Sequence, residues 1–198
     1  MTWWRSAVAD TRYILASRSP RRIELLASIG IECEVRPADI DETPLADELP
    51  FEYVLRLANE KARTVAGNLR ADEIVIGADT TIDLDGEIIG QPNDRAHAAE
   101  ILRRLSGRSH LVHTGVCILY GDTGHNYSQV VSTEVTFHSL TVGDIEAYLA
   151  SGEWEGKAGA YAIQGEGRSL VATTTGSIPN VIGLPVDHLT EALVPNPS

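Results

Sequence analysis

A short segment near the N-terminus combines residue types that bind anions. Residues 17–22 (Ser-Arg-Ser-Pro-Arg-Arg) follow an apolar run. Ser19 suits a helix N-cap and Pro20 the first helical position, so free backbone N–H groups and the positive end of the helix dipole should meet here. Arg21 and Arg22 stand where that dipole disfavours cations, but a bound phosphate would reverse this effect. We therefore expect a phosphate site; the alternative is that both arginines point into solvent or pair with an acid.

A carboxylate follows a second apolar run. Residues 74–78 (Ile-Val-Ile-Gly-Ala) predict a buried strand, and Asp79 comes directly after them. Buried carboxylates are rare unless they are paired or bind metal, and sites in open α/β sheets lie just beyond strand ends. Asp79 is therefore a candidate general base or Mg²⁺ ligand, with a turn residue as the alternative. Asp39, Asp41 and Glu42 could complete a hard-cation site with it.

Lysine is nearly absent from this chain. Only Lys61 and Lys157 accompany fourteen arginines among the sixteen basic residues. A general bias in composition toward Arg explains the imbalance, and Lys61 alone could be a surface residue of a helix. The six histidines lack zinc-binding spacing, and neither a P-loop nor a dinucleotide fingerprint is present. No serine or cysteine nucleophile motif occurs either.

Composition and charge limit the partners. The net charge of −12 argues against nucleic acid or an anionic membrane as the main partner, because both need a broad basic surface. No apolar run approaches the roughly 18 residues of a membrane span, and the start lacks a signal peptide. We expect a cytoplasmic protein of one domain over residues 1–198, with two lobes around a cleft. Residues 1–11, with Trp3 and Trp4, are expected to be a loosely ordered extension.

The elements that must position these residues alternate between strand and helix. Strands are predicted at 13–17, 32–36, 74–78, 111–120 and 130–137, a hairpin at 82–89, and a strand with a Gly-rich turn at 158–171. Helices are predicted at 20–30, 51–66, 94–105, 141–150 and 185–194. This order favours an α/β fold with a mixed sheet flanked by helices.

Ten short motifs, taken in order, resemble the Maf family of nucleoside triphosphate pyrophosphatases. They are 15–22 (LASRSPRR), 41–43 (DET), 57–62 (LANEKA), 77–80 (GADT), 106–107 (SG), 114–116 (TGV), 136–137 (TF), 152–153 (GE), 157–165 (KAGAYAIQG) and 181–185 (VIGLP). The resemblance covers nearly the whole chain from Tyr13. It implies an elongated mixed sheet of the Maf and ITPase kind and a homodimer.

The same resemblance implies an activity and a set of site residues. The expected reaction is hydrolysis between the α- and β-phosphates of a nucleoside triphosphate, with a divalent cation such as Mg²⁺, Mn²⁺ or Co²⁺. Glu42 and Asp79 are the expected metal-binding or base carboxylates, and Lys61 is the expected charge stabiliser. The expected substrate contacts are Ser17, Thr80, Arg21, Arg22, Gln91, Lys157 and Gln164.

Three of these positions indicate which base is bound. The branch resembling dTTP/UTP pyrophosphatases has Arg, Thr and Gln where this chain has Arg21, Thr80 and Gln164. The branch acting on 7-methyl-GTP has Trp, Gln and Glu at these places. The Gln164 amide offers both a donor and an acceptor, which suits the imide edge of uracil or thymine. We therefore expect a dTTP/UTP pyrophosphatase, with 7-methyl-GTP or another modified nucleotide as the alternative.

One position departs from the family pattern. Gln91 stands between Gly90 and Pro92 where family members usually have Lys. A cation expected near the phosphates is thus replaced by a neutral amide, and we expect reduced turnover. An alternative of a different class is a weakly catalytic nucleotide-binding regulator of cell division.

Overall fold

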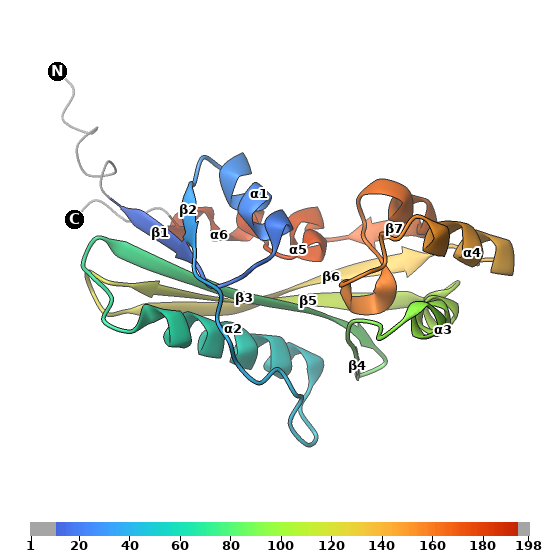
Figure 1. Cartoon of the computed structure of the whole chain (residues 1–198), viewed down its shortest axis with the longest axis horizontal. Coiled ribbons are helices and arrows are strands. Elements are labelled where there is room, and N and C mark those ends of the chain that lie inside the picture. Colours follow the sequence, from blue (N-terminus) through green and yellow to red (C-terminus); the bar gives the residue numbers. More distant parts are fainter. Residues whose placement is uncertain (1–10, 194–198) are drawn as a thin grey trace.

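A mixed sheet extends along the molecule (Figure 1). The computed structural model describes residues 11–193. The strand order is β2-β1-β3-β5-β6-β7, with β4 paired to β3. β1 pairs in parallel with β2 and β3, and the other pairs are antiparallel. The strands are β1 (Arg12–Leu15), β2 (Cys33–Val35), β3 (Glu73–Leu84), β4 (Glu87–Ile89), β5 (Ser109–Tyr120), β6 (Asn126–Phe137) and β7 (Val171–Thr175). The predicted mixed sheet is confirmed.

Helices cover both faces of the sheet (Figure 1). α2 (Pro50–Ala66) lies along one face, and α1 (Pro20–Ser28), α5 (Ile178–Ile182) and α6 (Val186–Leu193) lie along the other. α3 (Arg95–Leu105) and α4 (Val142–Ala150) pack on each other at the end of the sheet that carries β4 and β7. In residues 11–193 no helix combines the length and apolar character that a bilayer crossing requires.

The period-two alternation of β3 divides the core between these helices. Ile74, Ile76 and Ala78 pack with residues of α1 and α6, whereas Val75 packs with Ala58 and Ala62 of α2. Near the other end, β5 and β6 share a third cluster with α3 and α4. The sheet is therefore fixed from both sides where β1 ends, which is where the candidate residues gather.

The structure corrects two sequence predictions and adds one helix that was not predicted. Asp79 does not end a strand, because β3 continues to Leu84 through the segment where the hairpin was expected to begin. The segment 158–171 forms two 3₁₀ turns, η1 (Ala158–Ala160) and η2 (Gly165–Leu170), and not a strand. Positive φ angles at Gly159, Ala160 and Gly165 are incompatible with a regular strand there. α5 was not predicted. The expected extension, apart from Thr11, lies outside the described residues.

Candidate active site

A cleft opens where β1 stops beside β3. The last parallel pair joins Leu15 to Ile76, and the backbone of β3 continues beyond it with this edge free of β1. The cavity there has a volume of about 550 Å³. It is lined by the segment after β1, by α1, by the middle of β3, by Lys61 of α2 and by the turn around Lys157. The residues that the sequence assigned to phosphate and carboxylate chemistry are thus brought together.

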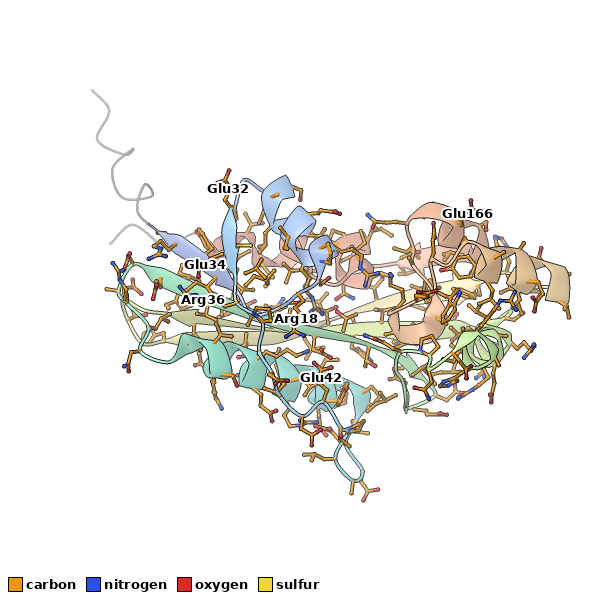
Figure 2. All side chains as sticks on the ribbon, viewed as in Figure 1. Arg18, Glu32, Glu34, Arg36, Glu42 and Glu166 are labelled. Atoms are coloured by element: carbon orange, nitrogen blue, oxygen red, sulfur yellow. The ribbon has the colours of Figure 1, made fainter. Side chains whose placement is uncertain are left out.

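The centre of the site is a lysine held between two carboxylates. Lys61 Nζ lies 2.6 Å from Asp79 Oδ1 and 2.7 Å from Glu42 Oε1. Lys61 and Asp79 are buried, whereas the Glu42 side chain is 54% exposed. Glu42 lies on the loop that passes from β2 across the sheet edge to α2 (Figure 2). The Lys61–Asp79 pair is held tightly, because leaving either of these buried charges without its partner costs several kcal/mol.

Two glycines bring α2 close enough to the sheet for Lys61 to reach Asp79. A Cβ on Gly77 would lie 2.2 Å from the Ala58 carbonyl oxygen, and one on Gly115 would lie 2.2 Å from that of Val54. Only a residue without a side chain allows this approach. The helix backbone is therefore seated directly on β3 and β5.

Burial raises the pKa of Asp79 above its ordinary value. The positive charges of Lys61 and Arg22 oppose this shift, and the negative charge of Glu42 adds to it. Removal from water disfavours the charged form of a carboxyl group, so the proton affinity of Asp79 is greater than that of an exposed aspartate. Such a carboxylate is suited to accept a proton.

Each nitrogen of the Arg22 guanidinium donates one hydrogen bond to the protein. Its Nε donates to the Gly183 carbonyl at 2.8 Å, its Nη1 to Ser17 Oγ at 2.9 Å and its Nη2 to Thr80 Oγ1 at 3.2 Å. The Thr80 hydroxyl lies 2.9 Å from that of Thr114. Burial lowers the pKa of Arg22, and Asp79 opposes that shift. Arg22 therefore connects α1, β3 and the end of α5 and places Ser17 and Thr80 in the cleft wall.

Arg21 of α1 and Lys157, which precedes η1, both present cations to the cleft. Within residues 11–193 neither has a carboxylate at ion-pairing distance, and Lys157 Nζ donates to the Glu155 carbonyl at 2.7 Å. Burial lowers the pKa of both groups, and the charge of Arg21 lowers that of Lys157 further. Two cations that disfavour each other create a potential that attracts an anion.

The remaining predicted residues are placed differently. Gln91 lines the cleft beside the Lys157 turn, where the Gly159 N–H donates to the Gly90 carbonyl at 3.0 Å. Gln164 is exposed, precedes η2 and is not among the residues that line the cleft. Its contact with a base stays a prediction.

The carboxylates of Glu42 and Asp79 could supply two of the ligands of a divalent cation. Glu42 and Asp79 both approach one point, the Lys61 ammonium, within 2.7 Å. In residues 11–193 no group of three His, Cys, Asp or Glu side chains gathers as a metal site. Mg²⁺ commonly uses only one or two carboxylates and completes its shell with substrate phosphates and water. The donor set is therefore consistent with a cation that binds together with a triphosphate.

The sequence analysis missed residues that support the site. An apolar wall of the cleft includes Ile82, Val112 and Tyr161, which core periodicity did not distinguish from ordinary packing. Tyr53 and Arg56 contact the loop that carries Glu42. Their spacing of three residues on the helix of Lys61 was the available signal, because such residues share a face.

The chain is similar to known proteins in sequence and in fold. The profile of the family described as "Maf-like protein" matches residues 12–195. A protein named dTTP/UTP pyrophosphatase from Anaeromyxobacter dehalogenans is 49% identical over 177 residues, which cover 88% of this chain and 89% of the relative. One of the same name from Myxococcus xanthus is 50% identical, with coverage of 89% and 88%. Among solved structures, the Ham1 protein of Staphylococcus aureus covers 64% of this chain and 72% of its own, with a TM-score of 0.47 at 18% identity.

Proposed function

This chain belongs to the family of Maf-like proteins, and from that premise we propose that it hydrolyses dTTP and UTP to the nucleoside monophosphate and pyrophosphate. The observation that most supports this is the buried Lys61–Asp79 pair, which lines the same cleft as Arg21 and Lys157. Attack on the α-phosphate needs a base for water and positive charge for the leaving pyrophosphate. The cleft offers both.

In the proposed reaction, side chains of the cleft accept the proton of the attacking water and bind the leaving pyrophosphate. A water oxygen bonds to the α-phosphorus while the bond from that phosphorus to the oxygen bridging to the β-phosphate breaks. The proton of the water passes to the Asp79 carboxylate, whose raised pKa favours this transfer. Arg21 and Lys157 hold the β- and γ-phosphates, and Lys61 keeps Asp79 oriented. The charge that develops on pyrophosphate is stabilised by these fixed cations.

We propose that a divalent cation binds with the substrate at Glu42 and Asp79. When bound, it would neutralise phosphate charge and orient the triphosphate. Lys61 holds both carboxylates, so it determines how far apart their oxygens lie. Mg²⁺, Mn²⁺ and Co²⁺ are the ions to be compared.

The preference for pyrimidines is supported by the names of the relatives and by the cleft. Ile82, Val112 and Tyr161 form an apolar wall on which a nucleobase can pack. Thr80 and Arg21 keep the residue types expected for dTTP and UTP. Gln164 would have to turn into the cleft to contact a base.

A cytoplasmic location is also proposed, since Cys33 and Cys117 are free thiols. The homodimer stays a prediction.

A panel of nucleoside triphosphates tests this function. Pyrophosphate and monophosphate release would be measured for dTTP, UTP, 7-methyl-GTP and the common triphosphates with each of the three cations. We expect the highest kcat/KM with dTTP and UTP. Preference for 7-methyl-GTP would contradict the base assignment. Binding without turnover of any triphosphate would support the regulatory alternative, which the neutral Gln91 favours.

A further inference from the structure

The loop that carries Glu42 has little support of its own. The segment between β2 and α2 contains no helix or strand from residue 36 to residue 49, and most of it is exposed. In Figure 1 it crosses the sheet edge and reaches down along α2. Glu42 is nevertheless only 2.7 Å from the Lys61 ammonium. Something other than regular structure must hold the loop in place.

Two side chains of α2 bind consecutive carbonyl groups of this loop. The Tyr53 hydroxyl donates to the Glu42 carbonyl at 2.9 Å, and Arg56 Nη2 donates to the Thr43 carbonyl at 3.2 Å. Arg56 also binds Glu48 bidentately, with Nε to Oε1 at 2.6 Å and Nη2 to Oε2 at 2.8 Å. The Glu48 carboxylate is itself buried and accepts the Leu45 N–H at 3.0 Å.

The contacts of Tyr53 and Arg56 with the loop should be present at neutral pH. A tyrosine phenol keeps its proton at neutral pH, so the Tyr53 hydroxyl remains a donor to the Glu42 carbonyl. The guanidinium of Arg56 lies 5.6 Å from the centre of the Tyr53 ring, within the range of a cation–π contact. A planar bidentate pair fixes direction as well as distance.

We propose that Tyr53 and Arg56 are positioning residues that hold the Glu42 carboxylate beside Lys61 and Asp79 for hydrolysis. α2 is a single helix, in which Arg56 follows Tyr53 by three residues and Lys61 follows Arg56 by five. The helix therefore sets the position of Glu42 relative to the same lysine that contacts Asp79. Neither Tyr53 nor Arg56 lines the cleft, so they act through Glu42.

Kinetics of Tyr53→Phe test the proposal, and this part of the test rests on the proposed pyrophosphatase activity. Loss of the hydroxyl should lower kcat about tenfold with KM for UTP unchanged, since one hydrogen bond and a small displacement are lost. In a Glu42→Gln background the same change should have no further effect. An unchanged kcat, or an equal fall in that background, would overturn the proposal. Tyr120→Phe is the matched control, because its hydroxyl also donates to a carbonyl, that of Ala192, far from the cleft.

Hydrogen exchange gives a readout that does not depend on activity. Amides of residues 39–49 should exchange faster in Tyr53→Phe and in Arg56→Lys, while β3 and the rest of α2 stay protected. Arg104→Lys is the control for the second variant, since Arg104 pairs bidentately with Glu87 on the surface. Unchanged exchange in both variants overturns the proposal. If the wild-type protein hydrolyses no triphosphate, the proposed function fails, and the exchange result alone then decides the positioning role.

Discussion

Lys61 stabilises two carboxylates that would otherwise repel each other across the floor of the cleft. It is 7% exposed and has ion pairs with Asp79 and Glu42. A buried carboxylate that loses its ion-pair partner must take up a proton or remain unfavourably charged. Structure and catalysis therefore depend on the same ammonium group.

Lys61→Met should lower the free energy of unfolding by about 3 kcal/mol at neutral pH, because Asp79 is left buried without this partner. Urea denaturation measures the change. Lys157→Met is the control, since among residues 11–193 the Lys157 ammonium bonds only the backbone carbonyl of Glu155, and its loss should change stability by less than about 1 kcal/mol. Equal effects of the two substitutions would show that the buried Lys61–Asp79 pair does not contribute more to the free energy of unfolding than Lys157 does.

Gln91→Lys should raise kcat/KM for UTP several-fold, because it adds a cation to the wall that carries Lys157. Steady-state kinetics at fixed ionic strength provide the measurement. Asn126→Lys makes the same change in net charge on an exposed strand end and should leave the rate unaltered. An unchanged rate in Gln91→Lys would show that the neutral amide is not what limits turnover.

Sequence reasoning found the charged residues of the site but not how they are used. Ser17, Arg22, Lys61 and Asp79 were singled out by type and context, and all line the cleft. The roles differ because tertiary contacts decide them: Arg22 is occupied by Gly183, a partner 161 positions away. No local pattern reveals such a contact. The predicted catalytic and metal-binding roles themselves stay predictions.

At the scale of elements, α2 positions Lys61 beside Asp79 of β3. Its apolar stripe was visible in the sequence, and the predicted 51–66 agrees closely with Pro50–Ala66. The length of β3 was not predicted, because Asp79 and Asp83 interrupt the apolar pattern that signals a strand. Both are accommodated by partners from elsewhere: Lys61 for Asp79 and His113 for Asp83. Polar residues paired across the fold thus conceal a strand from local analysis.

Gly115→Ala should push α2 away from the sheet, since the new Cβ would lie 2.2 Å from the Val54 carbonyl oxygen. We expect a loss of about 2 kcal/mol in unfolding free energy and a lower kcat, because Lys61 moves with the helix. Chemical denaturation and steady-state kinetics check the two effects. Gly143→Ala is the control: its nearest atom lies at an ordinary 3.6 Å, and stability should hardly change. If Gly115→Ala is equally silent, the close packing of α2 does not position the lysine.

At the scale of the whole molecule, a buried histidine should make stability depend on pH. His110 is 3% exposed, its Nε2 lies 2.8 Å from the Tyr161 hydroxyl, and burial lowers its pKa from 6.5 to about 4. The unfolded chain therefore takes up a proton at higher pH than the folded chain does. This contribution is fully present above pH 6.5 and is lost as the pH falls toward 4.

The expected loss over that window is roughly 3 kcal/mol, from a shift of more than two pKa units. Unfolding free energies of the wild type and of His110→Gln would be compared from pH 7 to pH 4. Carboxylates titrate alike in both proteins, so the difference between the two curves isolates the histidine. Parallel curves would contradict the assignment of a depressed pKa to His110.

The most direct test of the central claim compares the wild-type protein with Asp79→Asn on UTP. UMP and pyrophosphate would be quantified together, and UTP binding would be measured for both proteins. We predict equal amounts of UMP and pyrophosphate from the wild type and no turnover by Asp79→Asn, with UTP still bound through Arg21 and Lys157 on the cleft walls. Release of UDP and phosphate, or full turnover by Asp79→Asn, would contradict the account.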